Sequence, residues 1–216
     1  RAFDGDPAWS PDGSKIAFVG WRGDEPTNIF VLDLATGAST QLTFESALPG
    51  GAPSFSPDGS SIVYVAGRWG EGSQYPLHGP YEAWTVPVTG GESVRLTDRP
   101  FRGGRLSGQV AWLSPDGSLL SYSCVMGSAA LCIANADGTD ARVLARGTGI
   151  SSIDPGGWSP DGTRITYNEI LPQDVFILDV ATGQATYVAE GGSPTWLDDH
   201  TLIIEIARCY DHETGA

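Results

Sequence analysis

The chain is built from short runs in which apolar and polar residues alternate. Residues 15–19 (Lys-Ile-Ala-Phe-Val), 61–65 (Ser-Ile-Val-Tyr-Val) and 164–167 (Arg-Ile-Thr-Tyr) are examples. An alternation of period two is typical of a β-strand that buries one face. Clusters of Gly, Pro, Asp and Ser separate these runs and predict turns between them. The pattern therefore predicts an all-β chain.

One turn sequence recurs along the chain. Ser-Pro-Asp-Gly begins at residues 10, 56, 114 and 159, and a degraded copy, Leu-Asp-Asp-His, follows Trp196. Proline presets φ at the first central position of a turn, Asp suits the second, and Gly accepts the left-handed conformation that closes a hairpin. Five copies in 216 residues give a mean period of about 43 residues, within the range of roughly 40–45 that propeller blades have.

Each copy carries the same series of signals. An aromatic residue precedes the turn, an alternating strand follows it, and a third strand, a Gly-centred turn and a fourth strand complete the unit. Four antiparallel strands of this kind form one propeller blade. The aromatic residues are Trp9, Phe55, Trp112, Trp158 and Trp196. Because they recur at one position of the repeat, we expect them to pack between neighbouring blades rather than to stack a ligand.

Residues 7–44 resemble the TolB-like β-propeller repeat. They contain the aromatic residue, Ser-Pro-Asp-Gly, the Ile-Phe-Val-Leu-Asp strand at 29–33, the Thr-Gly turn at 36–37 and Gln-Leu-Thr at 41–43. Related repeats build periplasmic scaffolds, the propeller halves of serine peptidases and tricorn-type proteases, and oligogalacturonate lyases. The resemblance therefore implies a β-propeller and is less specific for function.

The predicted fold is a single all-β propeller of about five four-stranded antiparallel blades. The expected blades cover residues 4–44, 45–97, 98–145, 146–189 and 190–216. Residues 1–3 align with the tail of an outer strand, so we expect them to close the last blade. A closed five-bladed ring is preferred to a segment of a larger propeller, because an open arc exposes two strand edges.

Composition limits the classes of partner. The chain has 26 acidic and 12 basic residues and a net charge of −14. This charge repels polyanions, so we expect no nucleic acid partner. No apolar run reaches the roughly 18 residues that cross a bilayer, so we expect no membrane insertion. No leader peptide is recognisable at the start, and any such segment is expected to have been removed.

Two of the three cysteines lie in one predicted hairpin. Cys124 ends the second strand of blade three and Cys132 lies early on the third strand. The pair can form a disulfide or can be two small buried side chains, and Cys209 is left as an odd thiol. Propellers of this family resemble exported proteins, which implies a periplasmic or extracellular location and leaves both interpretations of the cysteine pair open.

No group of residues predicts catalysis. A Gly-x-Ser-x-Gly nucleophile motif is absent from the sequence, and the three histidines, His78, His200 and His212, are dispersed. The aspartates of the repeated turns occur once per blade, so turn formation explains them better than calcium binding does. We therefore predict neither an enzyme nor a bound metal or cofactor.

One face of the propeller concentrates aromatic and arginine side chains. Loops between second and third strands share a face with the crossovers between blades, which places the insertion 67–81 beside the crossover 98–109. The candidate ligand-binding residues on this rim are Trp21, Arg22, Arg68, Trp69, Tyr75, His78, Tyr81, Arg102 and Arg105. Arginine guanidinium groups, which can donate two parallel hydrogen bonds, and flat aromatic rings suit the binding of a sugar, an acidic group or a peptide. Alternatively, the long loop folds its own aromatic side chains inward.

These features favour a non-catalytic binding or scaffolding module. Its ligand-facing or partner-facing surface is predicted on the loop face of blades two and three, and the partner class is a protein, a peptide or a glycan. One alternative is the propeller domain of a larger hydrolase or peptidase that gates substrate. Another is a carbohydrate-binding, lectin-like propeller. The incomplete outer strand of the last blade also allows an oligomer formed by strand exchange.

Overall fold

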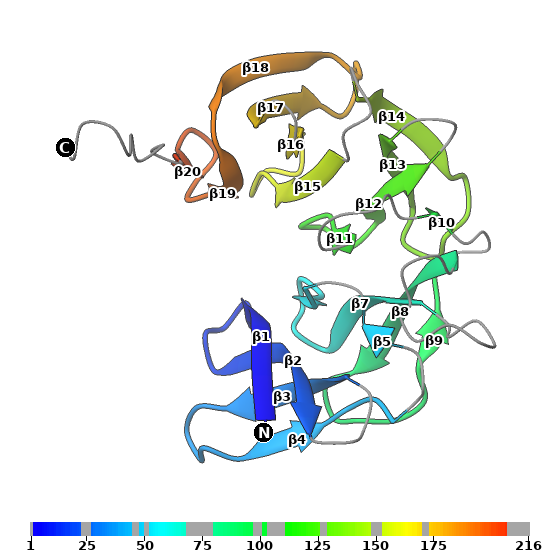
Figure 1. Cartoon of the computed structure of the whole chain (residues 1–216), viewed down its shortest axis with the longest axis vertical. Coiled ribbons are helices and arrows are strands. Elements are labelled where there is room, and N and C mark those ends of the chain that lie inside the picture. Colours follow the sequence, from blue (N-terminus) through cyan, green and yellow to red (C-terminus); the bar gives the residue numbers. More distant parts are fainter. Residues whose placement is uncertain are drawn as a thin grey trace, which may run out of the picture.

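The structure is a computed structural model. It describes residues 2–22, 27–44, 48–49, 52–67, 80–96, 101–102, 111–125, 129–147, 153–169 and 173–206. Among these residues all regular secondary structure is β-strand, in five antiparallel sheets that follow one another in sequence order. Figure 1 shows the sheets arranged as an arc, with the first and the last sheet at its two ends. The expected all-β propeller architecture is confirmed as four blades and a partial fifth.

Three of the sheets have four strands in simple up-and-down order. The first contains β1 (Ala2–Trp9), β2 (Lys15–Arg22), β3 (Asn28–Asp33) and β4 (Ser39–Gln41). The third contains β11 (Ala111–Leu113), β12 (Leu119–Val125), β13 (Ala129–Asn135) and β14 (Arg142–Arg146). The fourth contains β15 (Ile153–Trp158), β16 (Arg164–Glu169), β17 (Asp174–Asp179) and β18 (Ala185–Glu190).

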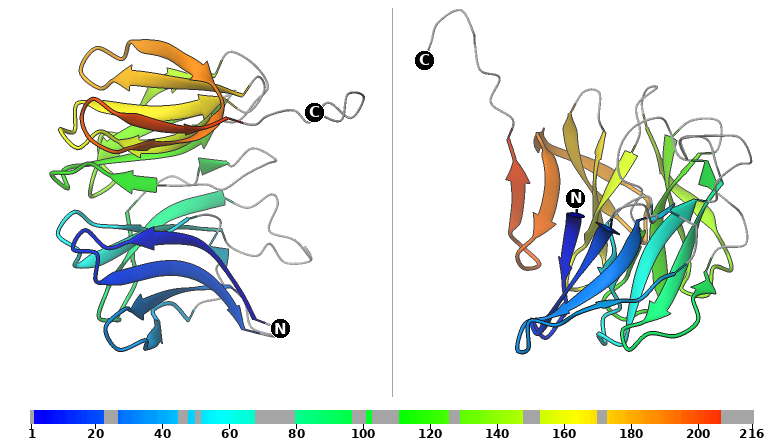
Figure 2. Two further views of the ribbon diagram at one scale, coloured as in Figure 1. Left: turned by 90° about the vertical axis from the view of Figure 1, so that its left-hand side faces the viewer. Right: turned by 60° about the horizontal axis from the view of Figure 1, so that its bottom comes forward.

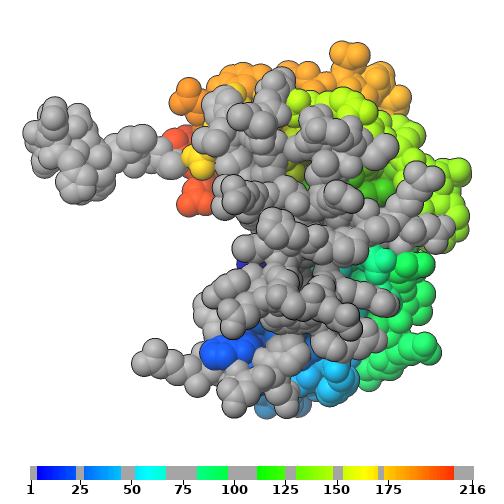
Figure 3. Space-filling model, turned by 45° about the vertical axis from the view of Figure 1, so that its right-hand side comes forward, coloured from blue at the N-terminus to red at the C-terminus, as the bar shows by residue number. Residues whose placement is uncertain are grey.

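The second sheet is a blade whose inner and outer strands are interrupted. Its strands are β5 (Leu48–Pro49), β6 (Ser54–Phe55), β7 (Ser61–Gly67), β8 (Pro80–Pro87), β9 (Val94–Arg95) and β10 (Phe101–Arg102). Both β5 and β6 pair with β7, and both β9 and β10 pair with β8. The last sheet has two described strands, β19 (Gly192–Trp196) and β20 (Leu202–Glu205). In the space-filling view of Figure 3, residues of the second, third and fourth sheets (green, yellow-green and orange) lie along the edge of the molecule.

The expectation that residues 1–3 close the last blade is wrong for Ala2 and Phe3. Ala2 pairs with Arg22 and Phe3 with Trp21, so both residues belong to β1 in the first sheet. A bulge between Gly5 and Ala8 keeps this upper part of β1 in register with β2. Among the described strands none of the first sheet pairs with the last sheet.

The repeated turns are held by their own aspartates. In the second sheet the carboxylate of Asp58 accepts hydrogen bonds from the Ser56 hydroxyl at 2.6 Å and from the backbone N–H of Ser60 at 3.0 Å. Gly59 has φ of +70°, a left-handed conformation that favours glycine. The turns at Asp12, Asp116 and Asp161 repeat these contacts. Figure 2 (left) shows the short turns gathered on one side of the molecule.

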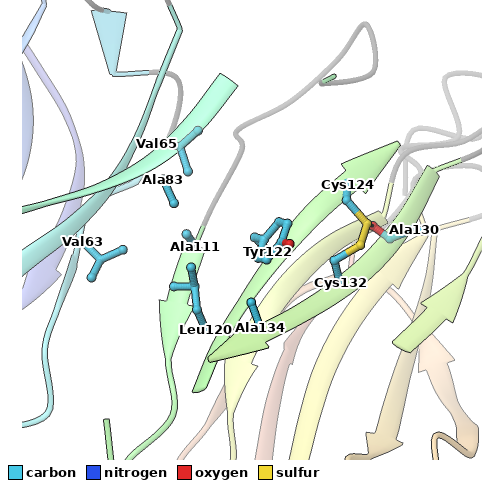
Figure 4. Close-up of a cluster of buried hydrophobic side chains, with 10 residues drawn as sticks. All are labelled: Val63, Val65, Ala83, Ala111, Leu120, Tyr122, Cys124, Ala130, Cys132 and Ala134. Atoms are coloured by element: carbon cyan, nitrogen blue, oxygen red, sulfur yellow. A yellow bond between two sulfur atoms is a disulfide. The ribbon is translucent and has the colours of Figure 1, made fainter. Parts of the chain in front are cut away.

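The core lies between the sheets rather than within one of them. Three clusters of buried apolar residues join sheets one and two, two and three, and three and four. In the second of these junctions Val63 and Val65 of β7 meet Leu120 and Tyr122 of β12 (Figure 4). Each sheet therefore buries its apolar faces on its neighbours, which is why the sheets stack into an arc.

The repeat aromatics do not all occupy one position. Trp158 and Trp196 pair with the first apolar residue of the next strand, but in the third sheet Leu113 holds that place and Trp112 pairs with Ser121. A shift of one residue turns a side chain to the opposite face of a sheet. Trp112 therefore packs with the fourth sheet, where its carbonyl accepts a hydrogen bond from Trp158 Nε1 at 3.2 Å. Phe55, Trp112 and Trp158 pack between blades, with Trp112 facing the other way, whereas Trp9 is 63% exposed.

The structure joins Cys124 of β12 to Cys132 of β13 by a disulfide (Figure 4). Their Cα atoms are 5.8 Å apart, within the usual range for this bond, and both side chains are buried. Cys209 lies outside the described residues. The described part of the chain contains no helix with the length and hydropathy needed to cross a membrane.

Acid should weaken the turns within a defined pH window. The hydrogen bond from the Ser56 hydroxyl, followed by those from Ser60, lowers the pKa of Asp58 from 3.8 to about 2. Because the folded-state pKa is below the unfolded value, the stabilisation is complete above about pH 4 and is lost as the pH falls through about 2. We expect Asp58→Asn to lower the thermal midpoint at pH 7, and this difference from wild type should shrink between pH 4 and pH 2. Circular dichroism melts measure it, and a difference that stays constant would contradict the assignment.

Loss of the disulfide should destabilise the third blade. The bond closes a loop with a sequence separation of 8, and loop-closure entropy predicts a contribution of about 2.5 kcal/mol. We expect this loss in the free energy of unfolding for a Cys124→Ala, Cys132→Ala variant in urea titrations. Reduced wild type should lose a similar amount. If both samples unfold at the same urea concentration as oxidised wild type, the bond does not stabilise the fold.

Candidate functional site

The structure brings together two parts of the predicted rim. β10 pairs with β8, so that Phe101 lies opposite Tyr81 and Arg102 lies opposite Pro80. The end of the long insertion and the start of the crossover are therefore neighbours in the second sheet. Trp21 and Arg22, at the end of β2, lie at the same ends of the sheets. The other candidates, Arg68, Trp69, Tyr75, His78 and Arg105, lie outside the described residues.

Arg22 is engaged by its own sheet. Its guanidinium donates a hydrogen bond to the carboxylate of Asp4 and another, at 3.2 Å, to the carbonyl of Trp21. It also lies 4.5 Å from the centre of the Phe30 ring, a cation–π distance. The side chain thus holds β1 and β3 to the end of β2. Trp21 beside it remains partly exposed.

A central cavity is the second candidate site. Its volume is about 1200 Å³, and inner strands and turns of the successive sheets line it. Its apolar walls include Phe55, Trp112, Trp158 and Trp196 together with the prolines Pro7, Pro11, Pro57, Pro115, Pro155, Pro160 and Pro194. The sequence pattern predicts these aromatics as packing residues between blades. Nearly every repeat contributes one aromatic residue and one turn proline to this lining. The regularity is the signal that could have indicated a shared cavity, because the inner strands of a propeller converge on its axis.

The polar groups of the cavity come from the last two sheets. Asp154 of β15 pairs with Asn168 of β16, and both residues line the cavity. Gln173 and Glu205 of the same side also line it. The cavity therefore has an apolar wall on most of its circumference and carboxylate and amide groups on one side, a distribution that can orient a bound segment.

The degraded turn of the last sheet links it to the fourth sheet. The Asp199 carboxylate accepts a hydrogen bond from the backbone N–H of Asp161 at 2.8 Å, and the Asp199 carbonyl accepts one from Arg164. The Arg164 guanidinium also lies 4.9 Å from the centre of the Trp196 ring. Asp198 takes the turn role, because the backbone N–H of His200 donates to it and lowers its pKa. This acidic turn is thus a structural contact between two blades.

Metal-binding residues do not gather in the parts of the chain that the structure describes. No group of three or more His, Cys, Asp or Glu side chains has an arrangement that could hold an ion there. The aspartates of the repeated turns instead accept hydrogen bonds from their own serine and threonine neighbours.

Comparisons with known proteins agree with this geometry. No protein-family model matches the chain. Over 37 residues, 17% of this chain and 8% of the relative, it is 51% identical to the Tol-Pal system protein TolB of Hahella chejuensis. The fold matches the crystal structure of TolB from Acinetobacter baumannii with a TM-score of 0.67 and 25% identity over 90% of this chain. The chain is a TolB-like β-propeller.

A second structure supports the same fold. Putative TolB from Agrobacterium tumefaciens matches with a TM-score of 0.68 and 17% identity, over 92% of this chain and 72% of that one. The TolB-like propeller described here spans 45% of the length of the Acinetobacter protein. The likeness therefore concerns the propeller fold and not the whole of that protein.

A substitution at the cavity wall should destabilise the junction between sheets four and five. A Cβ added to Gly156 would lie 2.5 Å from Pro194 Cγ and 2.7 Å from Thr166 Oγ1. We expect Gly156→Ala to lower the free energy of unfolding by about 1–3 kcal/mol, the usual cost of overpacking. Gly192→Ala is the matched control, because nothing lies within 4 Å of its added Cβ. Urea titrations in which both variants lose the same stability would contradict this packing.

Proposed function

We propose that this TolB-like propeller is a non-catalytic module that binds a protein or peptide on the loop face of blades two and three. The observation that carries the proposal is the pairing of β8 with β10, which places the ends of the insertion and of the crossover side by side. Rigid strands hold these loops, and loops on such scaffolds commonly carry the binding residues. Within this face we assign contact roles to Trp69, Arg102 and Arg105.

The central cavity supports a protein or peptide over a small ligand. Its walls combine large aromatic side chains and prolines with a few polar groups on one side. Such walls accept apolar side chains of an extended segment, while the peptide groups of that segment can bond to the polar side. The proposed partner therefore contacts the loop face and extends a segment into the cavity.

The relative's name supports an assembly with other proteins. The Hahella protein is called a Tol-Pal system protein, and we propose that this chain too works with partner proteins. We further propose a periplasmic or extracellular location. The Cys124–Cys132 disulfide supports it, because such bonds persist in oxidising compartments.

A peptide selection tests the proposed face. Wild type is used to select binders from a phage library of random dodecapeptides, and the affinity of the selected peptides is measured by calorimetry. We expect a Trp69→Ala, Arg102→Ala, Arg105→Ala variant to bind them at least roughly tenfold more weakly, which corresponds to about 1.4 kcal/mol. Loss of an aromatic platform and two arginine forks accounts for this size of effect.

A variant on the opposite face is the control. Leu34→Ala changes an exposed residue at the turn between β3 and β4 and should leave the affinity unchanged. Circular dichroism confirms that both variants fold. Equal affinity of the triple variant and wild type would contradict the proposed binding face. Binding to glycans but not to peptides on a parallel array would contradict the proposed class of partner.

A further inference from the structure

Six Asp–Gly pairs occur in the sequence, and all of them lie in the described part of the chain. The pairs begin at Asp4, Asp12, Asp58, Asp116, Asp137 and Asp161. An aspartate followed by glycine is susceptible to a spontaneous reaction, because glycine has no side chain to shield its backbone nitrogen. This nitrogen attacks the side-chain carboxyl carbon and a water molecule is lost, which forms a five-membered succinimide. Water then opens the ring, and attack at the main-chain carbonyl leaves the peptide running through the side chain as isoaspartate.

Four of the pairs belong to the Ser-Pro-Asp-Gly turns, in which the serine holds the carboxylate. In the second sheet the Ser56 hydroxyl donates to the Asp58 carboxylate at 2.6 Å, and the Ser56 oxygen accepts from the backbone N–H of Ser61 at 3.0 Å. Ser56 is buried, so water competes poorly for its hydrogen bonds. The same two bonds occur at Ser10, Ser114 and Ser159. The carboxyl group must leave this buried serine before it can react.

The turn between β13 and β14 lacks such a serine. Asn135 stands at its first position, and the Asn135 side chain donates to Thr139 and Asp140. Among the described residues the Asp137 carboxylate accepts hydrogen bonds only from the backbone N–H and the hydroxyl of Thr139, and both bonds are exposed. The Asp137 carboxyl group is therefore held less firmly than its counterparts in the repeated turns.

The backbone of this turn nevertheless resembles that of the repeated turns. The N–H of Gly138 donates to the Asn135 carbonyl at 2.8 Å, as the N–H of Gly59 donates to the Ser56 carbonyl at 2.9 Å. Both glycines have a positive φ. The missing serine hydroxyl is thus the difference that bears on the carboxyl group.

The remaining pair is held in a strand. Asp4 lies opposite Gly20 and Gly5 lies opposite Val19 in the ladder between β1 and β2. The Arg22 guanidinium donates a hydrogen bond to the Asp4 carboxylate. Ring closure at this pair would require the two strands to separate.

The ionisation of the carboxyl groups favours the same site. The carboxyl group reacts in its protonated form, because an ionised carboxylate resists attack by the nitrogen. The Ser56 hydroxyl is the largest cause that lowers the pKa of Asp58 from 3.8 to about 2, whereas Thr139 lowers the pKa of Asp137 without a serine. The serine therefore helps to keep the aspartate of a repeated turn in its unreactive form.

We propose that Asp137–Gly138 is the pair of this chain that converts most readily to isoaspartate, and that the serine of each repeated turn protects the aspartate two positions after it. The reaction needs no other reagent, since the water lost on ring closure is regained on opening. The product lengthens the backbone of the turn by one carbon atom and leaves a free α-carboxylate at residue 137. It therefore alters the hairpin that carries the outer strand β14. This modification goes beyond the proposed partner binding and does not depend on it.

Peptide mapping of the aged full chain tests the proposal. The protein is kept at body temperature in a mildly acidic buffer for several weeks, and electron-transfer fragmentation identifies isoaspartate in each peptide. We expect isoaspartate to accumulate at Asp137 roughly tenfold faster than in the four repeated turns, the factor in rate that corresponds to one hydrogen bond to a charged group. Protein unfolded in guanidinium chloride is the control, because all six pairs should then react at similar rates.

Two reciprocal substitutions test the role of the serine. Ser56→Ala removes the hydroxyl from one repeated turn, so the rate at Asp58 should approach the rate at Asp137 while Asp116 stays slow in the same sample. Asn135→Ser places a hydroxyl two positions before Asp137 and should slow its conversion roughly tenfold. Circular dichroism confirms that both variants fold. Equal accumulation at all six pairs of folded wild type overturns the proposal, and so does a Ser56→Ala variant in which Asp58 reacts no faster than Asp116.

Discussion

The fold depends on the burial of each sheet's faces by its neighbours in the arc. A single four-stranded blade has two apolar faces and cannot cover either by itself. The small residues that face the following sheet, such as Ala17 and Val63, let that sheet approach closely. The isoleucine, leucine or aromatic side chains that the following sheet turns toward them fill the space. Because the same contact recurs at each junction, the inner strands converge and a cavity forms along their axis.

The turns fix the register of the strands, whereas the core holds the sheets together. The hairpin that joins the first and second strands must close at the same place in each blade, or the buried residues would change faces. In four blades the Asp carboxylate fixes this point by accepting hydrogen bonds from residues on both sides of it. In the last sheet the turn is rebuilt without proline, and Asp199 reaches the fourth sheet instead. The aspartates of the turns therefore stabilise the fold through local hydrogen bonds, although the chain as a whole has a large net negative charge.

The strands and the repeat could be predicted from the sequence, because period-two alternation and a turn motif are local signals. The strand limits at the start could not be, since a bulge near Asp6 lets Ala2 and Phe3 continue β1. The one-residue shift that turns Trp112 toward the fourth sheet was also missed, because the aromatic residue looks equivalent when only sequence spacing is read. The pairing of Tyr81 with Phe101 and the contacts of Arg22 with Asp4 and Phe30 are tertiary, so neither could be predicted from the sequence.

The departures from the repeat are of two kinds, which differ in the part of the molecule that they contact. Asp199 departs from the pattern and contacts the fourth sheet, so its role is to hold the last sheet. The second sheet departs by dividing its inner and outer strands, and the added segments β5 and β10 lie beside β3 of the first sheet and β12 of the third sheet. The same division pairs β10 with β8, which brings the end of the insertion beside the start of the crossover. This departure therefore shapes the loop ends of the blade as well as its contacts with the neighbouring blades.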